Sequence, residues 1–351
     1  MSKFITISDI IESAKKYGEN NVLIWSPDKY RDNRTNKKQF DCTWVPITFK
    51  HVSGSEEPIK IKFTKVATSS GAKIPQSDGT IKNLNIVFNN VSEEDLLNES
   101  FANAEISEKL NNKVNTICKS TNEFVKAMKI MDASYKKICN DLKNATQLNF
   151  SIRKDKSIKD VNNISIHSIC QTHREDKDNT DNTIELENPL IRIKLIINPK
   201  NGLVGIDTWN KNIKAFEYRP NVYDVEKMNK KNDYKPILAT VDEDGVEAPL
   251  NKDNAQVFIT YRSIVSGIIE FKEVVISKFG FSLNNRFIDL YVKSNKNSMK
   301  KNDFSKEDRQ GLVDGESEEE EDIKSKKQDT SFNNLVSSDL ENCAELSDDS
   351  D

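Results

Sequence analysis

The stretch I-I-E-F-K-E-V-V-I, residues 268–276, is followed after a short connection by F-I-D-L-Y-V-K, residues 287–293. Both are rich in Ile, Val, Phe and Tyr, which favour β-strands. Similar strand-like segments occur at residues 21–25, 43–50, 59–63, 83–88, 191–195, 202–207, 214–219, 236–241 and 256–261. Many short strands with few helices predict an α+β protein built around an antiparallel β-barrel or a sandwich.

Two parts of the chain carry helical signals instead. Residues 7–17 predict a short helix, and residues 92–145 open with S-E-E-D, an N-cap residue followed by acids. Apolar positions then recur at alternating steps of three and four, with one polar member: Val114, Ile117, Thr121, Phe124, Met128, Met131, Tyr135, Ile138 and Leu142. This predicts one long amphipathic helix, packed either on its own core or against a second copy as a coiled-coil seam.

Alternation within two strands predicts which side chains face the core. In I-K-I-K-F, residues 59–63, the apolar side chains share one face, while Lys60 and Lys62 lie on the other. In residues 287–293 the aliphatic face is Ile288, Leu290 and Val292, and the opposite face is Phe287, Asp289, Tyr291 and Lys293. Because the purely aliphatic side is the better core, we expect the aromatic side to be exposed.

Charge divides the chain into a basic body and an acidic tail. The net charge of −4 conceals 17 Asp and Glu against 5 Lys and Arg in residues 303–351, a net of −12. The remaining 39 acids and 47 bases give residues 1–302 a net of +8. We therefore predict a body over 1–293 (β-rich 1–90, helical 92–145, β-rich 188–293) and a disordered acidic tail over 294–351.

Motifs for several kinds of chemistry are absent. The chain lacks G-x-x-x-x-G-K-[ST], G-x-G-x-x-G, G-x-S-x-G and H-E-x-x-H, and its five cysteines are scattered. The run H-x-x-C-x-x-H, residues 167–173, supplies three zinc ligands without a fourth. No apolar run reaches 18 residues. We expect a non-enzymatic, soluble intracellular protein with no catalytic residues, metal, cofactor or membrane partner.

Binding to nucleic acid requires cations for the phosphates and aromatic rings for the bases. Both residue types interleave in residues 25–44, where the candidates are Lys29, Tyr30, Arg31, Arg34, Lys37 and Lys38. As a long loop between strands, this segment resembles the binding loop of an oligonucleotide-binding (OB) barrel. A second interleaving supplies Trp209, Lys211, Lys214, Phe216, Tyr218 and Arg219. If residues 214–218 form a strand, Lys214, Phe216 and Tyr218 share one face.

Further candidates come from other strands and from one connecting segment. They are Lys60, Lys62, Arg192, Lys194, Tyr261, Arg262, Phe287, Tyr291 and Lys293. The side chains expected to stack on bases are Trp209, Phe216, Tyr218, Tyr261 and Tyr291. Together with the basic body, these clusters predict binding to single-stranded nucleic acid without sequence preference.

Four stretches resemble the single-stranded DNA-binding proteins of large cytoplasmic DNA viruses, of the poxvirus and asfarvirus type. They are I-S-D-I-I-E-S-A-K-K-Y with V-L-I-W-S-P-D (7–28), V-F-I-T-Y-R-S (257–263), I-I-E-F-K-E-V-V-I (268–276) and G-L-V-D before the acidic run (311–314). The resemblance implies an OB-type barrel that coats single strands during viral DNA replication, recombination or repair. It also implies an acidic C-terminus that regulates binding or recruits replication proteins, and a place in the host cytoplasm. The chain departs from this pattern in its length and in the long helix.

Several alternatives stay open at this stage. An RNA ligand, a homo-oligomer and a nuclear location fit the same features. A different class of function is an interaction scaffold or histone-chaperone-like factor, in which the acidic tail binds basic proteins and the long helix drives assembly. An enzyme with an unrecognised site is the third.

Overall fold

The computed structural model describes residues 4–26, 31–32, 43–74, 82–101, 107–144, 164–175, 183–210, 212–226, 237–240, 248–277 and 280–295. Its helices are α1 (Ile7–Tyr17), η1 (Glu19–Asn21), α2 (Glu93–Ser100), α3 (Glu108–Asn144) and α5 (Ala255–Phe258). Its strands are β1 (Ile5–Thr6), β2 (Leu23–Trp25), β3 (Arg31–Asp32), β4 (Thr43–Lys50), β5 (Glu56–Glu57), β6 (Ile59–Ala67), β7 (Ala72–Lys73), β8 (Asn83–Phe88), β9 (Ile166–His167), β10 (Cys170–Glu175), β11 (Thr183–Ile196), β12 (Ile206–Asn210), β13 (Ala215–Arg219), β14 (Val222–Asp224), β15 (Ile237–Leu238), β16 (Ile264–Ser277) and β17 (Gly280–Lys293).

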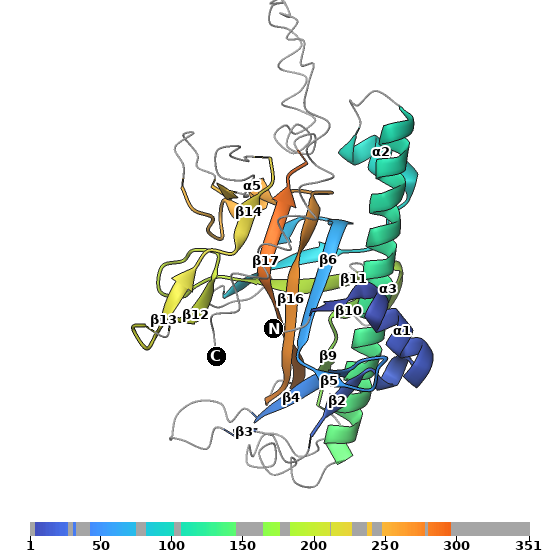
Figure 1. Ribbon diagram of the computed structural model, residues 1–351, viewed down its shortest axis with the longest axis vertical. Helices are drawn as coiled ribbons and strands as arrows, with labels where there is room; N and C mark the ends of the chain where they lie inside the picture. The colour runs from blue at the N-terminus through green and yellow to red at the C-terminus, as the bar shows by residue number, and fades with distance from the viewer. Residues whose placement is uncertain are drawn as a thin grey trace, which may run out of the picture.

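The fold is α+β, mostly strands with few helices, as the sequence predicts (Figure 1). The predicted tail over 294–351 lies outside the described residues, apart from residues 294–295.

A long antiparallel hairpin, β16 with β17, forms the axis of the larger sheet. The two strands pair from Ile264 opposite Lys293 to Ser277 opposite Gly280. On its other edge β16 pairs with β6 along one part and with β4 along another. The hairpin contains the two strand segments that the sequence marks most strongly, and it extends both of them.

A smaller sheet, β10-β11-β8-β7, crosses behind this hairpin (Figure 1). The two sheets meet where the Lys194 amide of β11 donates to Asn285 Oδ1 of β17, at 3.0 Å. The sheets curl in the manner of a half-barrel, and within the described residues the main path of the larger sheet ends at β1 and β15.

One hydrophobic core joins both sheets to α3. Its centre is an aromatic cluster with two rings from the larger sheet and one each from the smaller sheet and α3: Phe63 of β6, Phe287 of β17, Phe88 of β8 and Phe124. The Phe124 ring centroid lies 5.0 Å from that of Phe63 and 4.9 Å from that of Phe88. Burying such a side chain stabilises a fold by about 1.5–3 kcal/mol, so this cluster holds the layers together.

Helix α3 spans 37 residues along one side of the molecule (Figure 1). All nine stripe residues named above are buried, and α3 packs on β6, β2, α1 and η1 of the same chain. The polar member, Thr121, accepts the Ala67 amide at 2.9 Å and donates to the Ile117 carbonyl at 2.7 Å. The stripe is therefore packed inside its own fold.

Two local predictions are wrong. Residues 256–261 were expected to form a strand, but the chain there turns through the short helix α5. The turn before α5 is closed reciprocally, because the Asn251 amide donates to Asn254 Oδ1 at 2.8 Å and the Asn254 amide donates to Asn251 Oδ1 at 3.0 Å. This side-chain closure favours a turn over an extended strand.

The aromatic side of β17 is also not exposed. A β-bulge places Phe287 opposite Ile269 and Asp289 opposite Ile268, so Phe287 and Asp289 face opposite sides of the sheet. Phe287 is 0 % exposed in the aromatic cluster. Tyr291 is 3 % exposed, because its ring stacks on Tyr223 of β14 with centroids 5.0 Å apart.

Candidate nucleic-acid interface

Strands β12 and β13 form a two-stranded hairpin, which we call the arm. Among the described residues no other strand pairs with them, and the arm projects to the left of the main sheet in Figure 1. The register places Trp209 directly opposite Phe216. The arm therefore presents a cross-strand aromatic pair away from the core.

This aromatic pair is solvent-exposed. Trp209 is 48 % exposed and Phe216 is 62 % exposed, and the two rings meet edge to face with centroids 5.1 Å apart. Ile213, in the turn between the strands, is exposed as well. Large apolar side chains grouped on a projecting element indicate a binding surface, because leaving them in water is unfavourable.

Lys214 lies beside this pair but not in the predicted strand. Its φ is +51°, within the turn, and β13 begins one residue later at Ala215. Phe216 and Tyr218, two residues apart in β13, share a face as predicted, whereas Lys214 is set by the turn. The side chain of Lys214 is exposed.

Two residues that the sequence predicts to bind nucleic acid hold the base of the arm, Tyr218 on the segment just before β12 and Arg219 on β17 of the larger sheet. The Tyr218 hydroxyl donates to the Val204 carbonyl at 2.8 Å, and its ring covers Gly205 so closely that a Cβ there would lie 2.3 Å from a ring carbon. Arg219 Nη2 lies 3.0 Å from Asp289 Oδ1 and donates to the Ile288 carbonyl. Tyr218 and Arg219 are therefore anchors of the arm, and their predicted contacts with nucleic acid stay predictions.

The anchor carries an unusual carboxyl group. Burial raises the pKa of Asp289 to about 6, and the neighbouring Arg219 opposes this shift without cancelling it. Burial also raises the pKa of Tyr218. Both shifts are expected of polar groups packed beneath the arm rather than facing solvent.

The outer face of the larger sheet carries a second group of charges. Lys60 and Lys62 lie opposite the buried Ile59, Ile61 and Phe63, as predicted. Lys60 is the register partner of Glu270, and Arg286 Nη2 lies 2.8 Å from Glu270 Oε2. Arg286 is not among the predicted contacts. Its position between the buried Asn285 and Phe287 is the alternating pattern that places it on this face.

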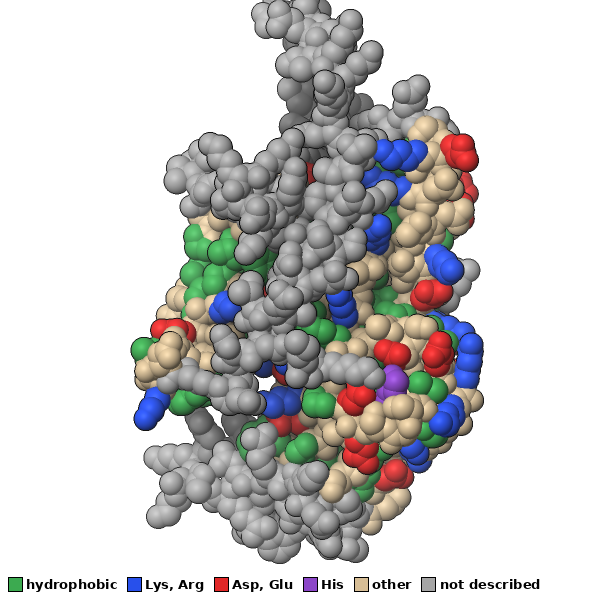
Figure 2. Space-filling view, viewed as in Figure 1, with side chains coloured by type: hydrophobic (Ala, Val, Ile, Leu, Met, Phe, Trp, Pro, Cys, Tyr) green, Lys and Arg blue, Asp and Glu red, His purple; other side chains and the backbone are tan. Residues whose placement is uncertain are grey.

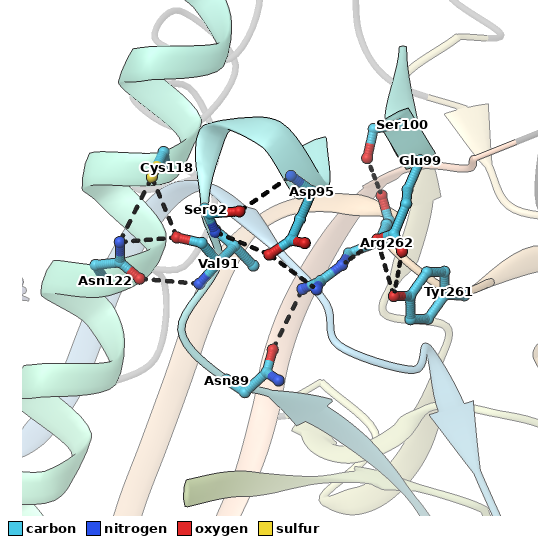
Figure 3. A network of polar contacts seen from close by, with 10 residues as sticks. All are labelled: Asn89, Val91, Ser92, Asp95, Glu99, Ser100, Cys118, Asn122, Tyr261 and Arg262. Carbon is cyan, nitrogen blue, oxygen red and sulfur yellow. Dashed lines mark hydrogen bonds and ion pairs between the residues drawn. The ribbon is translucent and has the colours of Figure 1, made fainter. Parts of the chain in front are cut away.

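Tyr261 and Arg262 belong to a polar network instead of an open surface (Figure 3). Arg262 is 6 % exposed, and it donates to Glu99 Oε2 at 2.9 Å and to Asn89 Oδ1 at 3.2 Å. The Tyr261 hydroxyl donates to the same Glu99 carboxylate at 2.8 Å. Its guanidinium fastens α2 to the segment before β16, and the predicted contact of Arg262 with nucleic acid stays a prediction.

The network also shifts two pKa values. Hydrogen bonds from the side chain and backbone of Ser92 lower the pKa of Asp95, with a smaller contribution from Arg262. Burial and the hydrogen bond to Glu99 raise the pKa of Tyr261. The Tyr261 hydroxyl is therefore bonded within the network, although its ring remains partly exposed.

The remaining candidates are dispersed. Arg192 is exposed on β11, whereas burial lowers the pKa of its neighbour Lys194. Lys293 Nζ lies 3.9 Å from Glu226 Oε1. Phe287 and Tyr291 are buried and cannot stack on a base while the sheet is intact. The predicted contacts Lys29, Tyr30, Arg34, Lys37, Lys38 and Lys211, and the side chain of Arg31, lie outside the described residues.

Within the part of the chain that the structure describes, no three His, Cys, Asp or Glu side chains gather as a metal site would require. In the same part, none of the helices has the length and apolar character needed to cross a membrane. Comparison of the chain with known protein families and with curated proteins finds no match.

Proposed function

We propose that the protein binds and coats single-stranded DNA without sequence preference, during replication, recombination or repair. The observation that carries this proposal is the exposed pair Trp209 and Phe216 on a projecting arm, with Lys214 beside it. A base stacked on an aromatic side chain contributes about 1–3 kcal/mol, and an adjacent lysine neutralises the phosphate that follows it. RNA has the same two features and is a second ligand to test.

The curled sheet extends this surface. Lys60 and Lys62 project from its outer face, and the half-barrel is the feature that we relate to a closed OB-type barrel. A body of net +8 attracts a polyanion, and the tail of net −12 is suited to regulate binding or to recruit replication proteins. By the resemblance described above, the place of action would be an intracellular, viral replication compartment.

The test is fluorescence anisotropy of the full-length protein with labelled single- and double-stranded oligonucleotides. Trp209→Ala and Phe216→Ala should each weaken single-strand binding about 5- to 150-fold, the equivalent of one lost stacking partner. Val257→Ala is the matched control, because Val257 is exposed to a similar extent outside the arm. Unchanged affinity in both arm variants, or loss of affinity in the control, contradicts the proposal.

A protein-binding scaffold is the second candidate, because Ile213 adds an aliphatic side chain to the exposed tip and cannot stack on a base as a ring does. In that case the wild type binds no oligonucleotide at low salt, while it binds histones or other basic proteins through the tail in a salt-sensitive manner. The same anisotropy titration, followed by a histone pull-down, separates the two functions.

A further inference from the structure

A cavity of about 380 Å³ lies between the end of β6 and the first turns of α3, away from the arm. Among the described residues its lining is Lys65, Glu108, Lys109, Asn112, Lys113 and Thr116. The lining contains three lysines, one amide side chain, one hydroxyl and one carboxylate, so its formal charge is +2. This is donor-rich chemistry, suited to an anion with several oxygen atoms.

The β6 side of the cavity is formed by a β-bulge. Phe63 pairs with Gly267 and Val66 with Val265, so two residues of β6 lie opposite the single Ser266. Lys65 has a φ of +54°, and its amide donates to Ser266 Oγ at 2.9 Å. A positive φ costs a lysine about 1–2 kcal/mol, and bulges commonly re-aim a side chain next to a functional site.

The α3 side presents its cations one turn apart. Lys109 and Lys113 are spaced i, i+4, and Lys113 Nζ lies 5.4 Å from the centre of the Phe101 ring. Like charges at this spacing on a helix repel each other. Thr116 and Asn112 continue the same side of the helix, where the Thr116 hydroxyl donates to the Asn112 carbonyl at 2.8 Å.

We propose that this cavity binds phosphate groups. We further assign the cavity as the place where the sugar–phosphate backbone of a bound strand passes from the sheet to α3. This second assignment rests on the proposed function. Lys65 belongs to the same strand as Lys60 and Lys62 of the outer face, and after the bulge it lines the cavity opposite Lys109 and Lys113 of α3. Figure 2 shows Lys and Arg side chains gathered along this edge of α3.

The first experiment measures the salt dependence of binding to a fluorescein-labelled oligo(dT) by the full-length protein. A Lys109→Ala/Lys113→Ala variant is compared with Lys119→Ala/Lys126→Ala, which makes the same charge change at exposed positions of α3 that do not line the cavity. Each lost phosphate contact lowers the slope of log K against log salt by about 0.7, so the cavity variant should lose about 1.4. Equal slopes in the two variants overturn the strand assignment.

The second experiment separates a strand from a free phosphate. Calorimetric titration of inorganic pyrophosphate should show binding to the wild type and to the control variant, and none to the cavity variant. No pyrophosphate binding to the wild type overturns the phosphate site. Pyrophosphate binding with an unchanged oligo(dT) slope overturns the strand assignment and leaves a site for a small phosphate compound. If the wild type binds no oligo(dT), the proposed function fails, and pyrophosphate still tests the cavity.

Discussion

Raising the pH from 4 to 7 is expected to lower the stability of the fold through ionisation of the buried Asp289. The side chain is 9 % exposed, and its pKa is about 6 in the folded protein against an ordinary value of 3.8. The folded state therefore holds a proton that the unfolded state releases between these two values. The stability from this group is complete below pH 3.8 and is lost as the pH rises through 6.

The size of this effect follows from the two pKa values. A difference of about two pH units corresponds to about 3 kcal/mol in the free energy of unfolding, at about 1.36 kcal/mol per unit. The partner Arg219 has a side chain that is 38 % exposed, so water remains available to it when the carboxylate is absent. Asp289→Asn, which resembles the protonated form, should therefore remove the pH dependence without stranding a buried cation.

The assay is urea denaturation of the wild type and Asp289→Asn at several pH values between 4 and 7.5. The other carboxyl groups cancel in the difference between the two proteins. Relative to the wild type, the variant should become more stable by about 2 kcal/mol across this range, because part of the effect is already lost at pH 4. A flat difference would refute the reasoning that burial dominates, and a difference of the opposite sign would show that the ion pair with Arg219 outweighs burial.

Two further predictions concern the segment that follows α5, residues 259–263, and the glycine that packs against it. Arg262→Ala should lower the free energy of unfolding by about 2 kcal/mol in urea denaturation, because the Glu99 carboxylate loses its cation. Its oligonucleotide affinity, measured under conditions where the variant is folded, should equal that of the wild type, and a specific loss would return Arg262 to the interface. Gly71→Ala should destabilise the fold by more than Gly202→Ala, since both have positive φ but only the Gly71 Cβ would lie 2.0 Å from the Ile259 carbonyl oxygen. Equal melting temperatures for the two glycine variants would contradict that close approach.

Local pattern was enough to predict much of the fold. The bounds of β4 and β8 match the predicted strands, and the alternation at residues 59–63 identified the core face of β6. These predictions succeed because a strand with one buried face repeats every two residues, and that period is visible in the sequence itself. The residues of the Val114 to Leu142 stripe are buried for the same reason, with a helical period.

The candidate site was predicted less well. Trp209 and Phe216 lie together on an exposed hairpin, as their spacing suggested, but Arg262 and Arg219 are occupied by acids distant in sequence. Nothing near Arg262 in the sequence indicates Glu99, which lies 163 residues away. The cavity beside Lys65 depends on a bulge that pairs two residues with one, and no composition signal marks it.

The sequence by itself determined most of the segments that form strands and helices, the core face of the regular ones, and that a basic body precedes an acidic tail. Only the tertiary structure decided whether the other face of a strand is covered by a second element, and which charged side chains form ion pairs. Phe287 and Tyr291 show why: one enters a core shared with Phe63 and Phe88, and the other stacks on Tyr223. Periodicity is a property of neighbouring residues, whereas burial and ion pairing depend on elements that only folding brings together.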